Sequence, residues 1–130
     1  SCRSRAREWM SAFALPDTSD EPEGENACAV LGRHAVWFYC VNGLVPPIRT
    51  FTICASDKQG AERERMRQYQ EIRRGKIDYV VIAGEYFKPD NTESPSLRAM
   101  RDLLSTEYCR ERSFFREVTN LDIYRRVKRD

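Results

Sequence analysis

The stretch Ile77-Asp78-Tyr79-Val80-Val81-Ile82-Ala83-Gly84 is a short, nearly continuous apolar run that is rich in β-branched residues. It follows a charged helical pattern over residues 61–75 and leads into a polar loop over residues 85–90. A strand that is buried on both faces of a largely parallel sheet has this composition. The stretch therefore predicts an α/β fold, although it carries no catalytic motif of its own.

Size and charge set the broad class of the chain. It has 130 residues, of which 41% are hydrophobic and 32% are charged, and its formal net charge is +2. This length and composition predict one globular α/β domain over residues 1–130, with a core that needs no metal or disulfide for stability. Because the net charge is so nearly balanced, we expect no nucleic-acid partner.

The five cysteines show no metal-binding spacing. No two of them form a Cys-x-x-Cys motif, and the chain has a single histidine, His34, so we predict neither a metal nor a cofactor. An odd number of cysteines argues against a complete disulfide framework. We favour buried thiols over the alternative, a bridge between Cys28 and Cys54 on neighbouring strands.

Three elements are predicted before residue 42. Residues 1–15 form an amphipathic helix that Pro16 ends, and an acidic loop follows over residues 16–26. Residues 27–31 read as a short buried strand. Residues 35–41 are apolar all round, which suits a helix or a strand, and we favour a short buried helix that Asn42-Gly43 ends.

The remaining pattern alternates between strands and helices. High β-propensity predicts a strand over residues 49–54. Ser56 or Asp57 then caps a helix to Arg74, and a further helix begins at Ser94-Pro95 and keeps one apolar face as far as Tyr108. Two strands, residues 114–118 and 121–127, complete the chain with Thr119-Asn120 as a two-residue turn.

The element order predicts the architecture. Alternating strands and helices imply right-handed crossovers with helices on the faces of the sheet. We therefore expect a small three-layer sandwich, in which a mainly parallel sheet of about five strands ends in an antiparallel hairpin.

The middle helix carries both signs of charge. Its six bases alternate with Glu62, Glu64 and Glu71. Charge mixed at this density is typical of a solvated helix with pairs between successive turns, which favours that interpretation over a nucleic-acid surface.

The candidate binding site follows from position. The chain has no Gly-rich dinucleotide motif, no Walker-type loop and no Gly-x-Ser-x-Gly elbow, so we predict no catalytic residue. In open α/β sheets, ligands bind beyond the carboxyl ends of the strands. Polar loops also occur there without a ligand. The residues expected at these ends offer both charge signs and an aromatic ring, which would suit a sugar or a phosphate: Gly32, Arg33, His34, Ser56, Asp57, Lys58, Glu85, Tyr86 and Asp90.

Three segments resemble, in order, a known family. They are Trp37-Phe38-Tyr39-Cys40-Val41-Asn42-Gly43-Leu44-Val45-Pro46-Pro47-Ile48-Arg49, Asp78-Tyr79-Val80-Val81 and Ile123-Tyr124-Arg125-Arg126. The pattern is similar to the soluble C-terminal domain of multi-spanning membrane glycosyltransferases that use polyprenyl-phosphate sugars, the protein mannosyltransferase-like enzymes. The likeness runs from residue 27 to the end of the chain.

The resemblance implies a non-catalytic domain on the extracytoplasmic face of the membrane. Such a domain would cover the membrane active site or help to recognise the acceptor. Its partners would be the upstream transmembrane portion of the same polypeptide, which the helix over residues 1–15 would continue, and a glycan or lipid-linked sugar. The resemblance adds Arg49 to the candidate ligand-binding residues Asp57, Glu85 and Tyr86.

Two other functions remain open. One is a stand-alone cytoplasmic α/β enzyme that acts on a phosphorylated or nucleotide ligand at the strand ends. The other is a protein-interaction module that uses the helix face of Trp9 and Phe13.

Overall fold

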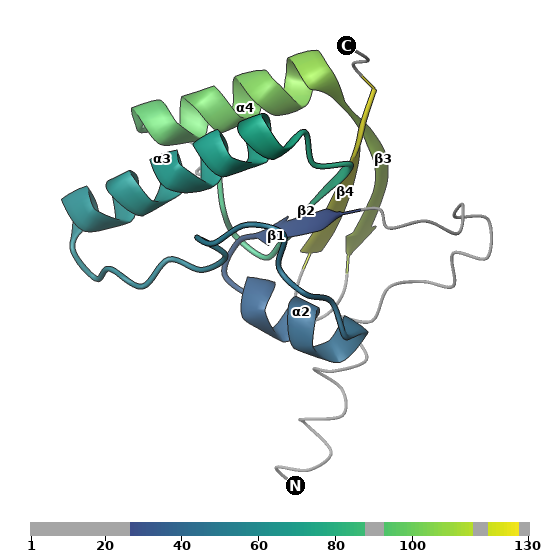
Figure 1. Cartoon of the computed structure of the whole chain (residues 1–130), viewed down its shortest axis with the longest axis horizontal. Coiled ribbons are helices and arrows are strands. Elements are labelled where there is room, and N and C mark those ends of the chain that lie inside the picture. The colour runs from purple at the N-terminus through teal and green to yellow at the C-terminus, as the bar shows by residue number, and fades with distance from the viewer. Residues whose placement is uncertain (1–26, 88–92, 116–119, 128–130) are drawn as a thin grey trace, which may run out of the picture.

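The computed structural model describes residues 27–87, 93–115 and 120–127. Its elements, in chain order, are β1 (Cys28–Leu31), α2 (Ala35–Asn42), α3 (Lys58–Gly75), β2 (Tyr79–Ala83), α4 (Pro95–Glu107), β3 (Tyr108–Phe115) and β4 (Asn120–Arg126) (Figure 1). The α/β class is confirmed. The helix predicted over residues 1–15 and the acidic loop over residues 16–26 lie outside the described residues.

In the part of the chain that the structure describes, the sheet has four strands in the order β1-β2-β4-β3. Only β1 and β2 run parallel, with Val30 opposite Val81. The pairings of β2 with β4 and of β4 with β3 are antiparallel. The prediction of about five mainly parallel strands was therefore wrong, because the described sheet is mixed and one predicted strand does not join it.

That missing strand is the segment over residues 49–54, which is irregular in the structure. The backbone N–H of Thr50 donates to the carboxylate of Glu71 (3.0 Å). The N–H groups of Cys54 and Ala55 donate to the carboxylate of Glu64 (2.7 and 3.1 Å). Because carboxylates on α3 satisfy these donors, the segment has no need of a neighbouring strand.

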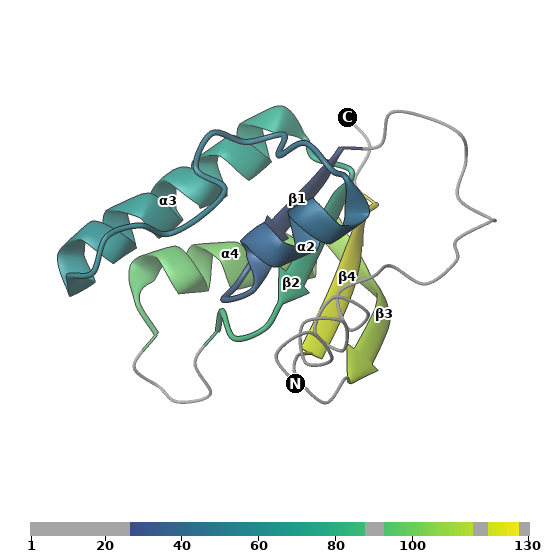
Figure 2. The same cartoon turned by 90° about the horizontal axis from the view of Figure 1, so that it is seen from below.

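The helices cover the two faces of the sheet unequally. Two of them, α3 and α4, lie on one face, where Ile72 and Met100 pack on Val80 and Ile82 (Figure 1). On the other face α2 packs its Phe38 against the sheet, and Figure 2 shows this helix in front of β1 and β2. In the described residues this second helical layer is a single eight-residue helix, rather than the full layer of the predicted three-layer sandwich.

Local signals in the sequence set most helix ends. Gly43 has a left-handed conformation (φ 61°), and its N–H and that of Leu44 donate to the last carbonyls of α2, as predicted. Asp57 caps α3, because its side chain accepts the N–H of Gly60 (2.8 Å). Pro95 opens α4, as predicted.

The C-terminal hairpin begins earlier than predicted. Tyr108 was placed on the apolar face of the preceding helix, but it is the first residue of β3, and its buried hydroxyl donates to the carbonyl of Ile77 (2.5 Å). Asn120 is already paired with Phe115. The predicted two-residue turn at Thr119-Asn120 was therefore wrong.

None of the helices in the described ranges is long and apolar enough to cross a membrane.

Candidate functional site

The candidate site lies where the parallel strands β1 and β2 end side by side. Each strand is followed by a glycine with a positive φ, Gly32 (109°) after β1 and Gly84 (85°) after β2. A Cβ on Gly32 would lie 2.6 Å from the carbonyl oxygen of Ala83, so no side chain fits there. The N–H of Arg33 donates to the carbonyl of Glu85 (3.1 Å), which ties the two loops together.

A cavity of about 330 Å³ opens at these strand ends, and we name it the strand-end cavity. Its volume is at the lower end of the range for small-molecule sites, about 300–1,000 Å³. Four parts of the chain line it, namely the two loops after β1 and β2, the irregular segment before α3, and α3 itself. The lining residues are Gly32, Arg33, Phe51, Thr52, Ile53, Arg65, Gln68, Glu85 and Tyr86.

Tyr86 and Gln68 form the deepest polar contact of the cavity. The Tyr86 hydroxyl donates to the side-chain oxygen of Gln68 (3.0 Å), and Gln68 is buried inside the inner stripe of α3. Burial raises the pKa of Tyr86 well above its ordinary value, and the nearby charge of Arg65 only partly opposes this rise. Tyr86 is therefore a neutral phenol at physiological pH, suited to hydrogen bonding rather than to proton abstraction.

Arg65 is held at the cavity by a polar network between α3 and α4. Its guanidinium lies 3.5 Å from the carboxylate of Glu62 and donates to the hydroxyl of Ser96 (3.4 Å). Glu62 accepts both the N–H of Ser96 (2.9 Å) and the Ser96 hydroxyl. Because these contacts to α4 and Glu62 hold the Arg65 side chain, its position is set before a ligand binds.

Glu62 keeps its charge in this network. Partial burial opposes the charged form, but hydrogen bonds from Ser94 and Ser96 and the charge of Arg65 outweigh it. Together they hold the pKa of Glu62 below its ordinary value. The carboxylate of Glu62 therefore stays ionised at neutral pH.

His34 lies beside the cavity without lining it. His34 precedes the first residue of α2, and its backbone N–H donates to the carbonyl of Ala83 (2.9 Å). Burial, helped by the charge of Arg33, lowers the pKa of His34, while Glu85 opposes the shift. The imidazole is therefore neutral at physiological pH.

The structure brings together only part of the predicted site. Glu85 and Tyr86 line the cavity beside Gly32 and Arg33, as their position at the strand ends suggested. Asp57 instead caps α3 and is exposed. Arg49 is also exposed and does not line the cavity. Ser56 and Lys58 do not line it either, and Asp90 lies outside the described residues.

Sequence reasoning missed the residues that α3 and the irregular segment contribute. Arg65 was assigned to a solvated helix, Gln68 was given no role, and Phe51 was assigned to a strand. Gln68 did carry a signal, because it stands four residues before Ile72, on the same side of the helix as that apolar residue. In the structure the ring of Phe51 stands edge-on to that of Tyr39, with centroids 6.3 Å apart, which anchors the segment to α2.

Two further observations bear on ligands. In the described part of the chain, no three acidic, histidine or cysteine side chains come together as a metal site would require, and Cys28, Cys40, Cys54 and Cys109 form no disulfide with one another. A second hollow of about 460 Å³ lies between α4 and the hairpin, where the guanidinium of Arg101 sits 4.4 Å over the ring of Phe87. It shares no lining residue with the strand-end cavity, although the ring of its Phe87 lies 5.2 Å from that of Tyr86.

No protein-family model, curated protein or solved structure matches this chain.

Proposed function

We propose that this domain is a binding module for a phosphorylated saccharide, which it holds in the strand-end cavity without transforming it. The observation that carries the proposal is the composition of the cavity. Two arginines, Arg33 and Arg65, line it together with Glu85 and with the aromatic residues Phe51 and Tyr86. Guanidinium groups suit phosphate oxygens, and carboxylates and aromatic rings suit the hydroxyls and faces of a sugar.

The cavity favours binding over chemistry because its deep groups already have partners. Tyr86 is a neutral phenol bonded to Gln68, and Arg65 is bonded to Ser96 and paired with Glu62. These contacts make a rigid set of donors and acceptors at the base of the cavity. Rigid groups of this kind discriminate between ligands by fit.

The sequence resemblance supplies the setting of the proposal. In that setting the domain is the soluble C-terminal part of a membrane glycosyltransferase, on the extracytoplasmic face, where it aids recognition of a lipid-linked sugar or of the acceptor. The full open reading frame tests this setting. Several apolar spans encoded before Ser1 would support it, whereas a frame that begins at Ser1 would contradict it.

The cavity itself is tested by titrating mannose 1-phosphate into ¹⁵N-labelled protein and following the amide resonances. We expect shifts at Arg33, Glu85 and Tyr86, smaller shifts with mannose alone, and a loss of binding in Arg65→Gln. Arg67→Gln is the matched control, because Arg67 is on the same helix but exposed and outside the cavity. Shifts confined to the hollow around Phe87, or none at all, would contradict the proposal.

A second candidate function is an enzyme that acts on a phosphorylated or nucleotide ligand in the same cavity. The observation that favours it is the neutral His34 close to Glu85, because a neutral imidazole beside a carboxylate can accept a proton. Incubation with sugar phosphates and nucleotides, followed by ³¹P spectra, distinguishes the two functions. New phosphorus signals that disappear in His34→Gln would favour the enzyme over the binding module.

A further inference from the structure

The exposed side of α3 carries a row of positive charge. Gln59, Arg63, Arg67, Gln70 and Arg74 recur at intervals of three or four residues, so they share one face of the helix, and all five are exposed. We call this row the outer face of α3. It contains three arginines and no acid, and Arg73, next to Arg74, is also exposed.

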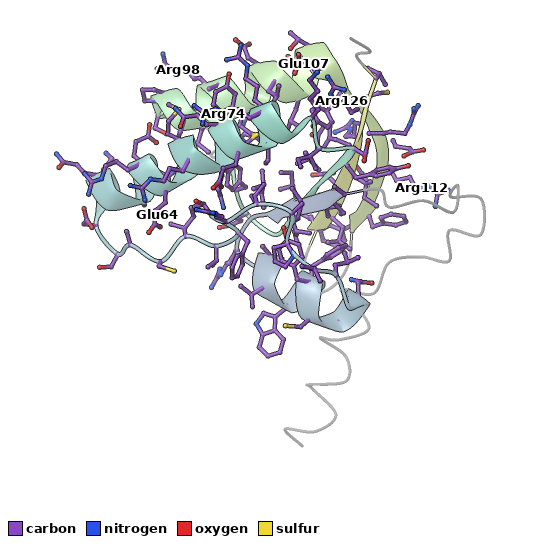
Figure 3. All side chains as sticks on the ribbon, viewed as in Figure 1. Glu64, Arg74, Arg98, Glu107, Arg112 and Arg126 are labelled. Atoms are coloured by element: carbon purple, nitrogen blue, oxygen red, sulfur yellow. The ribbon has the colours of Figure 1, made fainter. Side chains whose placement is uncertain are left out.

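The acids of the same helix are turned away from this face. Glu62 accepts hydrogen bonds from Ser96 on the side of α4. Glu64 and Glu71 accept backbone N–H groups from residues 50–55 on the opposite side, and Figure 3 shows Glu64 toward that segment. The three carboxylates are therefore used in hydrogen bonds at the sides of α3, whereas Arg63, Arg67 and Arg74 are exposed on its outer face.

The surroundings of α3 decide what the outer face can meet. Helix α4 packs along one side of α3, and the segment over residues 50–55 is bonded to the other, so the outer face is the side of α3 that these neighbours leave exposed. Contact on both sides leaves less of α3 free to enter the major groove of duplex nucleic acid than an unflanked helix offers. The outer face also lacks aromatic rings on which single-stranded bases would stack. A planar anionic surface needs only a row of cations at one level.

We propose that the outer face of α3 docks this domain onto an anionic phospholipid surface. At 1.5 Å per residue, the row from Arg63 to Arg74 is about 16 Å long, enough to engage more than one lipid phosphate. Long arginine side chains place their charged ends at a headgroup layer while their stems lie along the protein. The surface is separate from the strand-end cavity, because Arg65 points inward and is bonded to Ser96.

The test is cosedimentation of the full chain with vesicles of phosphatidylcholine alone and of phosphatidylcholine mixed with phosphatidylglycerol. We expect binding to the mixed vesicles only, and weaker binding as salt is added. The triple variant Arg63→Gln, Arg67→Gln, Arg74→Gln removes three cations from the outer face and should bind on the order of 100-fold more weakly. The charge-preserving set of three Arg→Lys substitutions at these positions should retain binding, and circular dichroism checks that each variant is folded.

A matched control removes the same charge elsewhere. It is the triple variant Arg110→Gln, Arg112→Gln, Arg125→Gln, whose three positions are on the hairpin. Figure 3 shows Arg112 far from α3, so this variant should bind vesicles like the original chain. An equal loss in both variants would overturn the proposal, because only net charge would then matter. Absence of vesicle binding, or binding to duplex or single-stranded RNA in its place, would also overturn it.

Discussion

The two halves of the sheet differ in how they use their strands. In the parallel half, β1 and β2 are buried between helices on both faces, and they end together at two glycines that open a cavity. In the hairpin half, β3 shows most of its side chains to solvent, and Phe115 at its end is 85% exposed. The cavity thus forms where helices cover the strands on both faces and the strands end side by side. The hairpin instead forms the other edge of the sheet and carries charged side chains.

Truncation of one phenylalanine in each half should give the largest difference in stability. Phe38 is fully buried where α2 covers the sheet, so Phe38→Ala should lower the free energy of unfolding by about 3–5 kcal/mol. Phe115→Ala removes the same side chain from the hairpin, where it is exposed, and should change it by less than about 0.5 kcal/mol. Urea titrations measure both. Equal losses would mean that the hairpin carries as much of the core as α2 does.

The glycine at the end of β1 gives the next largest effect. Gly32→Ala places a Cβ against the backbone of Ala83 at a positive φ, and we expect a loss of about 2–3 kcal/mol. Gly43→Ala also has a positive φ but meets no atom within 4 Å, so it should lose only about 1 kcal/mol. Thermal unfolding compares the two variants. If both lost the same amount, backbone strain alone and not the close approach of β1 and β2 would explain the glycine.

A smaller effect is expected at the outer edge of β1. The buried N–H of Val30 donates to the hydroxyl of Tyr39 (2.7 Å), and burial raises the pKa of Tyr39 to about 12. Tyr39→Phe leaves this donor without an acceptor and should lower the free energy of unfolding by about 1–2 kcal/mol. Hydrogen exchange at the Val30 amide should also become faster. An unchanged exchange rate would show that the hydroxyl is not the acceptor that protects it.

The smallest expected effect is on the free energy of unfolding at acidic pH. The folded-state pKa of Glu62 lies below its ordinary 4.5, so the unfolded chain takes up this proton at a higher pH than the folded chain does. The stabilisation from Glu62 is therefore fully present above about pH 4.5, and it is lost as the pH falls through the lower folded-state pKa.

In Glu62→Gln this part of the acid sensitivity should disappear. Urea midpoints at about pH 6 and about pH 3 measure it, and we expect a difference of less than about 1 kcal/mol between the variant and the original chain. Glu111→Gln removes an exposed carboxylate of the hairpin, 3.8 Å from Arg125, and should keep the acid-dependent loss. An acid response that is unchanged in Glu62→Gln would contradict the network between α3 and α4.

Sequence patterns predicted the elements that local chemistry determines. The apolar run around Val80 gave β2, and Asp57, Pro95 and Gly43 gave helix ends that the structure confirms. The strand predicted over residues 49–54 failed for a non-local reason. β-propensity does not show that carboxylates of α3, up to 21 residues away, accept the N–H groups of that segment.

The site was predictable to a similar degree. The rule that ligands bind beyond strand ends found Glu85 and Tyr86, because the chain passes directly from β2 into the cavity. Arg65 and Gln68 were missed, since their role depends on how α3 is rotated against the sheet. That rotation follows from the packing of Ile72 and from the bonds of Glu62, which no local pattern reveals.

The phenol of Tyr39 also bears on solubility. An edge strand with open N–H groups can recruit a strand from another molecule, which is the first step of edge-to-edge aggregation. On β1 the N–H of Val30 is not open, because it already donates to the hydroxyl of Tyr39. The opposite edge, β3, is guarded by other means, with the charged side chains of Arg110 and Arg112 and a register shift between them. The sheet therefore has a different barrier against self-association at each of its two edges.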